Sequence, residues 1–235
     1  MDTMISADEM QVLFDALPDV VFFVKDNESR YTHLNLTLVQ RLGRKHRSEV
    51  IGKSTVEVFP LPLGGNYLMQ DRRVLHGEVI ENQLEVHLFP NRTPGWCLTF
   101  KRPLCRQDEV VGVVGISRDL GQPDSRHSAY ERLNLALTYM QAHHGENLRI
   151  KTLADLAGVS VAQLERHFRR VFQLTPQQLL TKMRIESAMR LLQDDKSIAA
   201  IGQLCGFADQ SAFARQFKAT VGMTPRDFRT LARQP

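Results

Sequence analysis

The sequence predicts an α+β fold, in which an N-terminal antiparallel sheet with short helices precedes an all-α domain of two helix-turn-helix units. The first observation is a set of β-branched or alternating runs within residues 20–118. The second is the change to helical spacing of apolar residues after residue 128. The third is one helical pattern that occurs twice in that second part.

The chain is long enough for two domains, and its composition is that of a globular protein. It has 235 residues, of which 43% are hydrophobic and 24% charged. It contains no apolar run of about 18 residues and no basic start followed by an apolar stretch, so we expect a cytoplasmic protein without a membrane span or export signal. Its three cysteines, Cys97, Cys105 and Cys205, are scattered and odd in number, which argues against a disulfide framework.

A short stretch rich in Gly, Pro, Asp and Ser divides the chain. It runs from Asp119 to Ser125, and it places a first domain at 1–120, a linker at 121–128 and a second domain at 129–235. The charge divides at the same place, since residues 1–125 sum to −3 and residues 126–235 to +7. Positive charge therefore gathers in the domain that carries the repeat, as phosphate binding requires.

The first domain is expected to begin with a helix and to close with three strands. We expect a helix at residues 7–17, then two strands at 20–24 and 30–34 separated by a turn at 25–29. Short helices are expected within 35–76, and the three closing strands at 82–89, 95–104 and 109–118. In the strand 82–89, Leu84 and Val86 alternate with Glu85 and His87, a pattern typical of a half-buried strand. The run Val110–Ile116 predicts a buried central strand, with glycines where another group packs closely.

This order of elements resembles a PAS domain over residues 7–120. The residues that carry the resemblance are Pro18–Asp26, Gly52-Lys53-Ser54, Trp96, Pro103-Leu104 and Gly112–Asp119. The resemblance implies a sensor of a small molecule or another cytoplasmic signal, and another small α+β sensory domain is the alternative. Four apolar residues on the expected strands are candidates to line a ligand pocket or to be ordinary core: Phe22, Phe23, Leu98 and Phe100.

The second domain repeats one pattern at fixed offsets. Counted from Leu164, an arginine stands at +2, a phenylalanine at +4 and Thr-Pro at +11 and +12, and the offsets from Phe213 are the same. Each copy follows a short helix and a tight turn that contains Gly158 or Gly206. A short helix, a tight turn and a second helix with a polar face predict a helix-turn-helix whose second helix enters the major groove.

The helices of this domain are predicted from their caps as well as from their spacing. We expect helices at residues 129–143, 152–157, 161–172, 176–193, 197–204, 210–221 and 225–232. Ser160, Thr175 and Asp209 are the expected N-caps of three of them, because their short oxygen-bearing side chains accept from the first turn. The long helix that begins at Pro176 is expected to connect the two units rigidly, so that two recognition helices reach successive major grooves about 34 Å apart.

Residues 129–232 are similar to the DNA-binding domain of AraC/XylS-family transcription regulators. The strongest matching stretch is Gly206-Phe207 to Phe217-Lys218, completed by Gly222-Met223-Thr224-Pro225. The resemblance implies promoter binding, usually activation and contact with RNA polymerase, and a homodimer through the first domain. Carried over by position, the base-contacting residues are Ala162, Glu165, Arg166, Gln210, Ser211, Ala214 and Arg215. Phosphate anchors are expected at Arg169, Arg170 and Lys218.

Two positions depart from the family pattern. Gln173 stands where glycine usually ends the recognition helix, which we expect to cost on the order of 1 kcal/mol. Gly202 stands where alanine is usual. Ala162 and Glu165 offer only weak contacts to bases, so base recognition by the first helix-turn-helix is expected to depend mainly on Arg166.

Enzymatic and cofactor alternatives find little support in the residues. Neither a phosphate-binding loop nor a nucleophile motif is present, so we expect no catalytic residue, no metal and no cofactor. His143-His144 lacks further ligands, and His76 is the one candidate for a haem-sensing alternative. A redox sensor, or a cysteine-dependent DNA-repair protein using Cys97 or Cys105, is the remaining alternative.

Overall fold

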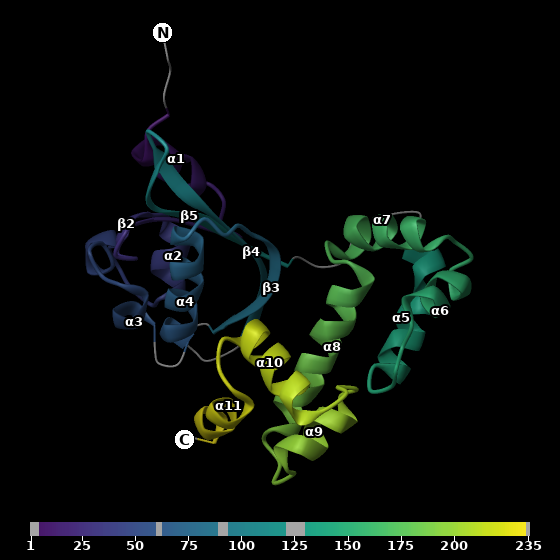
Figure 1. Cartoon of the computed structure of the whole chain (residues 1–235). Helices are drawn as coiled ribbons and strands as arrows, with labels where there is room; N and C mark the ends of the chain where they lie inside the picture. The colour runs from purple at the N-terminus through teal and green to yellow at the C-terminus, as the bar shows by residue number, and fades with distance from the viewer. Residues whose placement is uncertain (1–4, 60–62, 89–93, 121–129, 234–235) are drawn as a thin grey trace. The chain divides into compact units, whose positions relative to one another are not determined.

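The computed structural model describes residues 5–59, 63–88, 94–120 and 130–233. The chain forms two compact units, one built around a β-sheet and one built from helices (Figure 1). The linker predicted at 121–128 lies outside the described residues. Within the described parts of the chain, no helix combines the length and apolar character needed to cross a membrane.

The sheet has five antiparallel strands in the order β2-β1-β5-β4-β3. Their bounds are Val20–Asp26 (β1), Tyr31–Leu34 (β2), Ile80–Leu88 (β3), Pro94–Arg106 (β4) and Glu109–Asp119 (β5). These bounds confirm the predicted strands, and β5 is central as expected. Gly112 lies where a Cβ would stand 2.1 Å from the carbonyl oxygen of Lys25, which confirms the expected close packing.

The expected burial of the whole run that begins at Val110 is wrong at its start. Val110 and Val111 are exposed, with 36% and 37% of their surface accessible. The register explains this, because β1 ends at Asp26, which pairs with Gly112. The first residues of β5 therefore extend beyond β1 and lie against β4 alone.

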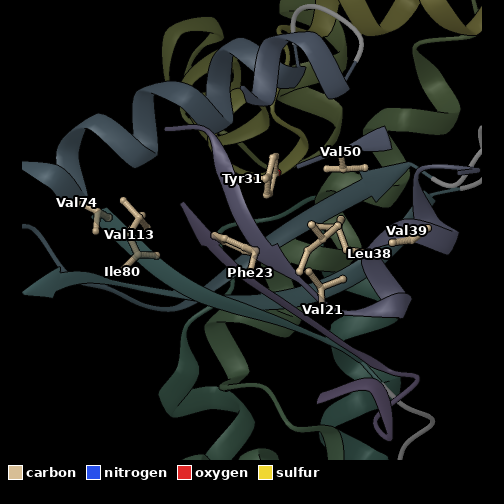
Figure 2. Packing of buried hydrophobic residues seen from close by; sticks show 10 residues of the cluster. Val21, Phe23, Tyr31, Leu38, Val39, Val50, Val74, Ile80 and Val113 are labelled. Carbon is tan, nitrogen blue, oxygen red and sulfur yellow. The ribbon is translucent and has the colours of Figure 1, made fainter. Parts of the chain in front are cut away.

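Helices lie on both faces of the sheet. Helix α1 (Ala7–Asp15) packs on one face through Phe14, whose ring stacks on Phe22 with centroids 4.6 Å apart. The opposite face is covered by short helices, as predicted, and by one helix that is longer than predicted. They are α2 (Leu36–Arg41), the 3₁₀ turn Arg47–Glu49, α3 (Thr55–Val58) and the longer α4 (Leu63–Leu75). Figure 2 shows the buried cluster between them and the sheet, which contains Phe23, Tyr31 and Leu38.

The second unit consists of seven helices in the described residues. They are α5 (Tyr130–His143), α6 (Ile150–Leu156), α7 (Val161–Phe172), α8 (Pro176–Leu191), α9 (Ile198–Leu204), α10 (Gln210–Val221) and α11 (Pro225–Ala232). The predicted caps are confirmed, since Ser160 accepts from the backbone of Gln163, Thr175 from Gln178 and Asp209 from Ala212. The helical prediction therefore holds for every element of this unit.

Candidate DNA-binding surface and sensor cavity

The first helix-turn-helix buries one side of its second helix and exposes the other. Leu164 and Phe168 are fully buried in the core of the unit. The turn before α7 passes through Gly158, whose φ of 64° lies in the left-handed region that favours glycine. The structure places every residue predicted for DNA contact on this helix at the exposed surface: Ala162, Glu165, Arg166, Arg169 and Arg170.

The second helix-turn-helix repeats this arrangement on α10. Phe213 and Phe217 are fully buried and stack edge to face, with ring centroids 5.6 Å apart. The predicted contact residues lie on the other side, where Ala214 is partly exposed and the rest are exposed: Gln210, Ser211, Arg215 and Lys218. The two units therefore present matching polar helix faces.

The cations on these faces are available to an external partner. In the part of the chain that the structure describes, no ion pair includes Arg166, Arg169, Arg170, Arg215 or Lys218. Arginine presents a planar fork of donors that fits phosphate and the edge of guanine. Among the described residues their charge is thus not neutralised by an acidic side chain, which favours a polyanionic ligand.

Within the helical domain, a junction that the sequence did not reveal joins the loop after α5 to the second helix-turn-helix. The Arg184 guanidinium on α8 donates to the carbonyl oxygens of His144 and Glu146, each at 2.7 Å. A Cβ at Gly206, in the turn before α10, would stand 2.8 Å from that same His144 oxygen. Gly145 is similarly tight, since its Cβ would stand 2.6 Å from the Leu204 carbonyl oxygen. Arg184 and the two glycines therefore join the loop after α5 to the turn of the second unit.

Both departures from the family pattern have structural counterparts. Gln173 ends α7 in the left-handed conformation with φ 59°, which is the conformation that glycine adopts at lower cost. At Gly202, a Cβ would stand 3.0 Å from the Cβ of Phe213, so the smaller residue allows α9 to approach α10 closely.

The sheet unit contains a cavity of about 60 Å³ between the sheet and its covering helices. Its apolar wall includes Val21, Phe23, Leu38 and Phe59. The other lining residues are polar or aromatic: Lys25, Tyr31, Arg41, Tyr67, Glu85, His87, Cys97, Thr99, Lys101 and Ser117. The combination of an apolar wall with convergent polar groups is shared with small-molecule sites, although such sites are generally larger than this cavity.

Only one of the four predicted pocket residues lines this cavity. Phe23 does, but Phe22, Leu98 and Phe100 lie on the opposite face of the sheet. Strand alternation decides this, because neighbours along a strand point to opposite faces. Phe22 instead packs on α1, and it shares its face with Phe100 through the register with Ile116. Phe22 and Leu98 are buried as ordinary core, which is the alternative that the sequence left open, and Phe100 is partly buried on the same face.

The most unusual group beside the cavity is a buried cluster of two lysines and one aspartate. Lys25 on β1 and Lys101 on β4 both bind the Asp71 carboxylate of α4, with Lys101 Nζ 2.7 Å from Oδ1. Less than 5% of each side chain is exposed. Burial raises the pKa of the Asp71 carboxyl, but the charges of Lys101 and Lys25 outweigh burial and lower that pKa to about 2.

The sequence pattern gave no warning of this cluster. Lys25 was expected to begin a turn, but it is the sixth residue of β1 and is in phase with Val21 and Phe23. Lys101 follows Cys97 and Thr99 at alternate positions of β4 in the same way. A lysine in phase with buried residues was the available signal, although an exposed lysine at a strand end has the same pattern.

The expectation that Glu85 and His87 face solvent is also wrong. Both are buried and line the cavity, because helices cover this face of the sheet and Gln70 of α4 reaches Glu85. Glu85 accepts from the side-chain amides of Gln70 and Gln83, and burial raises the pKa of its carboxyl. Burial, with a smaller contribution from Arg41, lowers the pKa of His87 to about 3, so its imidazole is neutral at physiological pH.

Cys97 and His76, two residues considered for the repair and haem alternatives, are not arranged for those functions. Burial raises the pKa of the Cys97 thiol to about 12, which is opposite to the activation that a nucleophilic cysteine needs. His76 is exposed, and its ring hydrogen-bonds the Arg72 carbonyl oxygen at the end of α4. Among the residues that the structure describes, no three His, Cys, Asp or Glu side chains are grouped to hold a metal.

Comparison with known protein families gives two matches. A family model described as a helix-turn-helix domain matches residues 153–230. A second model, described as a PAS fold, matches residues 14–124. Together these matches confirm both resemblances that the sequence patterns indicated.

Similar proteins include transcription regulators. The HTH-type transcriptional activator RhaS of Escherichia coli (strain K12) is 30% identical over 217 residues, which cover 89% of this chain and 75% of that protein. A solved AraC-type regulator structure from Chromobacterium violaceum is 34% identical, with a TM-score of 0.42, over 45% of this chain and 95% of that one. The DNA-binding domain of AdpA, solved with a target DNA, is 29% identical, with a TM-score of 0.42, over 43% of this chain and 93% of that one.

Proposed function

Because the chain belongs to the AraC/XylS family of transcription regulators, we propose that it binds double-stranded promoter or operator DNA through α7 and α10. The observation that carries this proposal is the matched exposure of Arg166 and Arg215 on the two repeated helices, neither with an acidic partner among the described side chains. Two recognition helices in one chain contact successive major grooves without a second protomer.

The exposed faces divide by chemistry into base and phosphate contacts. Arg166 and Arg215 reach guanine edges, while Gln210 and Ser211 contact bases near the start of α10. Arg169, Arg170 and Lys218 lie further along the helices, where they anchor phosphates. Ala162, Glu165 and Ala214 complete the base-contacting set, with apolar contact from the alanines and an acceptor for cytosine from Glu165.

The sheet unit serves as the sensor in this proposal. Residues 1–120 form the sensor domain and residues 129–235 form the DNA-binding domain, and residues 121–128 connect the two. A small-molecule effector occupies the cavity beside Phe23 and Lys101 and changes the affinity of the DNA-binding domain for DNA. The chain has no catalytic role in this proposal and acts in the cytoplasm.

The proposed assembly is a homodimer that activates transcription together with RNA polymerase. Helix α1 supports the dimer, because Val12 and Leu13 are 65% and 63% exposed although both are large and apolar. Adjacent exposed apolar side chains on a helix are typical of a surface that another protein covers. The activating output follows the relative from Escherichia coli, whose name describes an activator.

The test is operator binding by Arg215→Ala, with Arg226→Ala as the matched control. Arg226 is also exposed, but it lies on α11, outside both recognition helices. Loss of a bidentate base contact should weaken binding to a selected operator by about 1–3 kcal/mol and relax the preference at one base pair. Arg226→Ala should bind as the unaltered protein does. Unchanged affinity and selectivity in Arg215→Ala would contradict the proposed contact.

A further inference from the structure

The buried cluster beside the cavity holds more positive charge than its own carboxylate balances. Lys25 and Lys101 share Asp71, so this cluster sums to one positive charge. Lys25 Nζ also donates to the Thr55 hydroxyl at 3.3 Å. Among the described residues, Asp71 is the one hydrogen-bond acceptor for the Lys101 ammonium, which carries three N–H groups. Lys101 therefore has more N–H groups than hydrogen-bond acceptors among the described residues, and its Nζ otherwise faces the rings of Phe23 and Tyr67, although only 4% of the residue is exposed.

One further carboxylate beside the cavity, Glu85, interacts with the charge of Lys101, but it lies beyond ion-pair distance and burial raises its pKa, so it offsets this excess only in part. Glu85 on β3 has no cation within ion-pair distance among the described residues, and neutral amides from Gln70 and Gln83 bind it instead. Arg41 on α2 is already paired with Asp119 at the end of β5. A buried ammonium without a matching anion is costly, so a ligand that carries a negative charge gains more here than a neutral one.

The remaining walls define the body of that ligand. The rings of Phe23 and Tyr67 lie 5.7 and 5.6 Å from Lys101 Nζ, and Val21, Leu38 and Phe59 continue the apolar lining. An inorganic anion would leave this apolar surface without a partner. The hydroxyls of Thr99 and Ser117 lie 3.0 Å apart on the same wall and bond one another, and Thr99 also binds Glu85, so they add polar lining without a free donor. The cavity of about 60 Å³ is smaller than the cavity of about 150 Å³ that holds benzene, so the body is compact.

From this arrangement we propose that the effector is a small organic carboxylate, with its charged group against Lys101 and its hydrocarbon body against Val21, Phe23 and Leu38. The inference rests on the proposed sensing function and adds the chemical class of the ligand. Lys101 is the residue that favours a negatively charged carboxylate over a neutral ligand. Lys25, held by both Asp71 and Thr55, keeps the aspartate in place.

The experiment compares acids with their isosteric amides. Isothermal titration calorimetry of the full-length protein uses propionate, butyrate and isovalerate as sodium salts, together with the amide of each skeleton. We expect at least one acid to bind at least about tenfold more tightly than its amide, because charge-assisted hydrogen bonds are stronger than neutral ones. Equal binding of acid and amide across the series would overturn the proposal. So would the failure of every acid to bind a protein that still binds its operator.

Two variants assign the selectivity to Lys101. Lys101→Met should lose the preference for acids, and it should fold because Lys25 and Asp71 then balance one another. Lys101→Gln, which keeps a donor without the charge, is the second variant and should lose the same preference. Arg102→Met is the matched control, since Arg102 is the next residue of β4, is exposed and pairs with Glu81. Retention of the full preference in both Lys101 variants would contradict the assignment.

Operator binding on the same preparations separates this inference from the proposed function. Acid binding that leaves operator affinity unchanged would support the ligand class and contradict sensing. Amide binding that changes operator affinity would support sensing and contradict the ligand class.

Discussion

The two helix-turn-helix units have the same sequence pattern, yet their turns have different surroundings. A Cβ at Gly158, in the first turn, would meet nothing within 4 Å. A Cβ at Gly206, in the second turn, would stand 2.8 Å from the His144 carbonyl oxygen and 3.0 Å from Arg184 Nε. The first turn is therefore constrained by its own backbone alone, whereas the second is also held by the junction with α5 and α8.

This difference shows how one repeated motif acquires two mechanical roles. Both glycines have positive φ, 64° at Gly158 and 78° at Gly206, so both are favoured for local reasons. Only Gly206 is also required for packing, because the loop after α5 approaches it closely. The turn of the second helix-turn-helix is thus fixed against the loop after α5, whereas the turn of the first helix-turn-helix has fewer packing constraints.

The largest expected effect is on stability when each turn glycine is changed to alanine. Gly206→Ala should lower the free energy of unfolding by about 2–4 kcal/mol, because left-handed strain adds to an overpacked backbone contact. Gly158→Ala should cost only about 1–2 kcal/mol, from strain alone. Urea titration followed by circular dichroism at 222 nm measures both changes. Equal losses in the two variants would show that the junction does not distinguish the turns.

The next effect concerns the junction arginine. Arg184→Ala should weaken binding to a two-segment operator by about 2 kcal/mol, because two charge-assisted hydrogen bonds to backbone carbonyls are lost. Binding to DNA that contains one segment alone should change much less, since each recognition helix keeps its own face. Gel-shift titrations with both DNA lengths give the comparison, and Arg226→Ala is the control. A parallel loss on both DNA lengths would point to general destabilisation instead.

The two reading helices should differ in how widely the base contacts are distributed. Arg166→Ala should cost about 1–3 kcal/mol of operator affinity and remove most of the preference in the first segment, because Ala162 and Glu165 are weak base readers. Arg215→Ala should leave partial preference in the second segment, where Gln210 and Ser211 remain. Selection from randomised operator sequences measures both preferences. Retention of the base preference in the first operator segment by Arg166→Ala would contradict this expected difference between the two helices.

The smallest expected effect lies at the ends of the recognition helices. Gln173 and Gly222 occupy equivalent positions of the repeat, with φ of 59° and 81°. Gln173→Gly should stabilise the protein by about 0.5–1 kcal/mol, because glycine accepts the left-handed conformation without a Cβ penalty. Thermal unfolding measures this gain, and Gln193→Gly, at an exposed residue just after α8, controls for a general effect of glycine. A loss of stability in Gln173→Gly would mean that the glutamine side chain makes a compensating contact.

Local patterns were sufficient for the order of elements and for the reading helices. The offsets around Leu164 and Phe213 predicted two equivalent helices, and the caps Ser160, Thr175 and Asp209 lie where the sequence placed them. Such signals are reliable because a helix cap or an amphipathic face is settled within a few residues. The exposed residues of α7 and α10 followed directly from that periodicity.

The sensor cavity was only partly predictable, because alternation along a strand assigns two faces without saying what covers each one. Of the four residues that were candidates for pocket lining or core, Phe23 lines the cavity, while Phe22, Leu98 and Phe100 lie on the opposite face of the sheet. Glu85 and His87 were expected in solvent, although α4 and the short helices bury their face. A sheet with helices on both faces removes the usual polar side from the pattern.

The sequence by itself determined the elements, the repeat, the division of charge and the identity of the residues on both recognition helices, since these depend on neighbours within a few positions. The tertiary structure alone decided that Lys25, Asp71 and Lys101, distant in sequence, meet beside one cavity. It alone decided that Gly206, unlike Gly158, lies against another segment. Local periodicity cannot encode these contacts, because their energy arises only when separate elements exclude water from the same space.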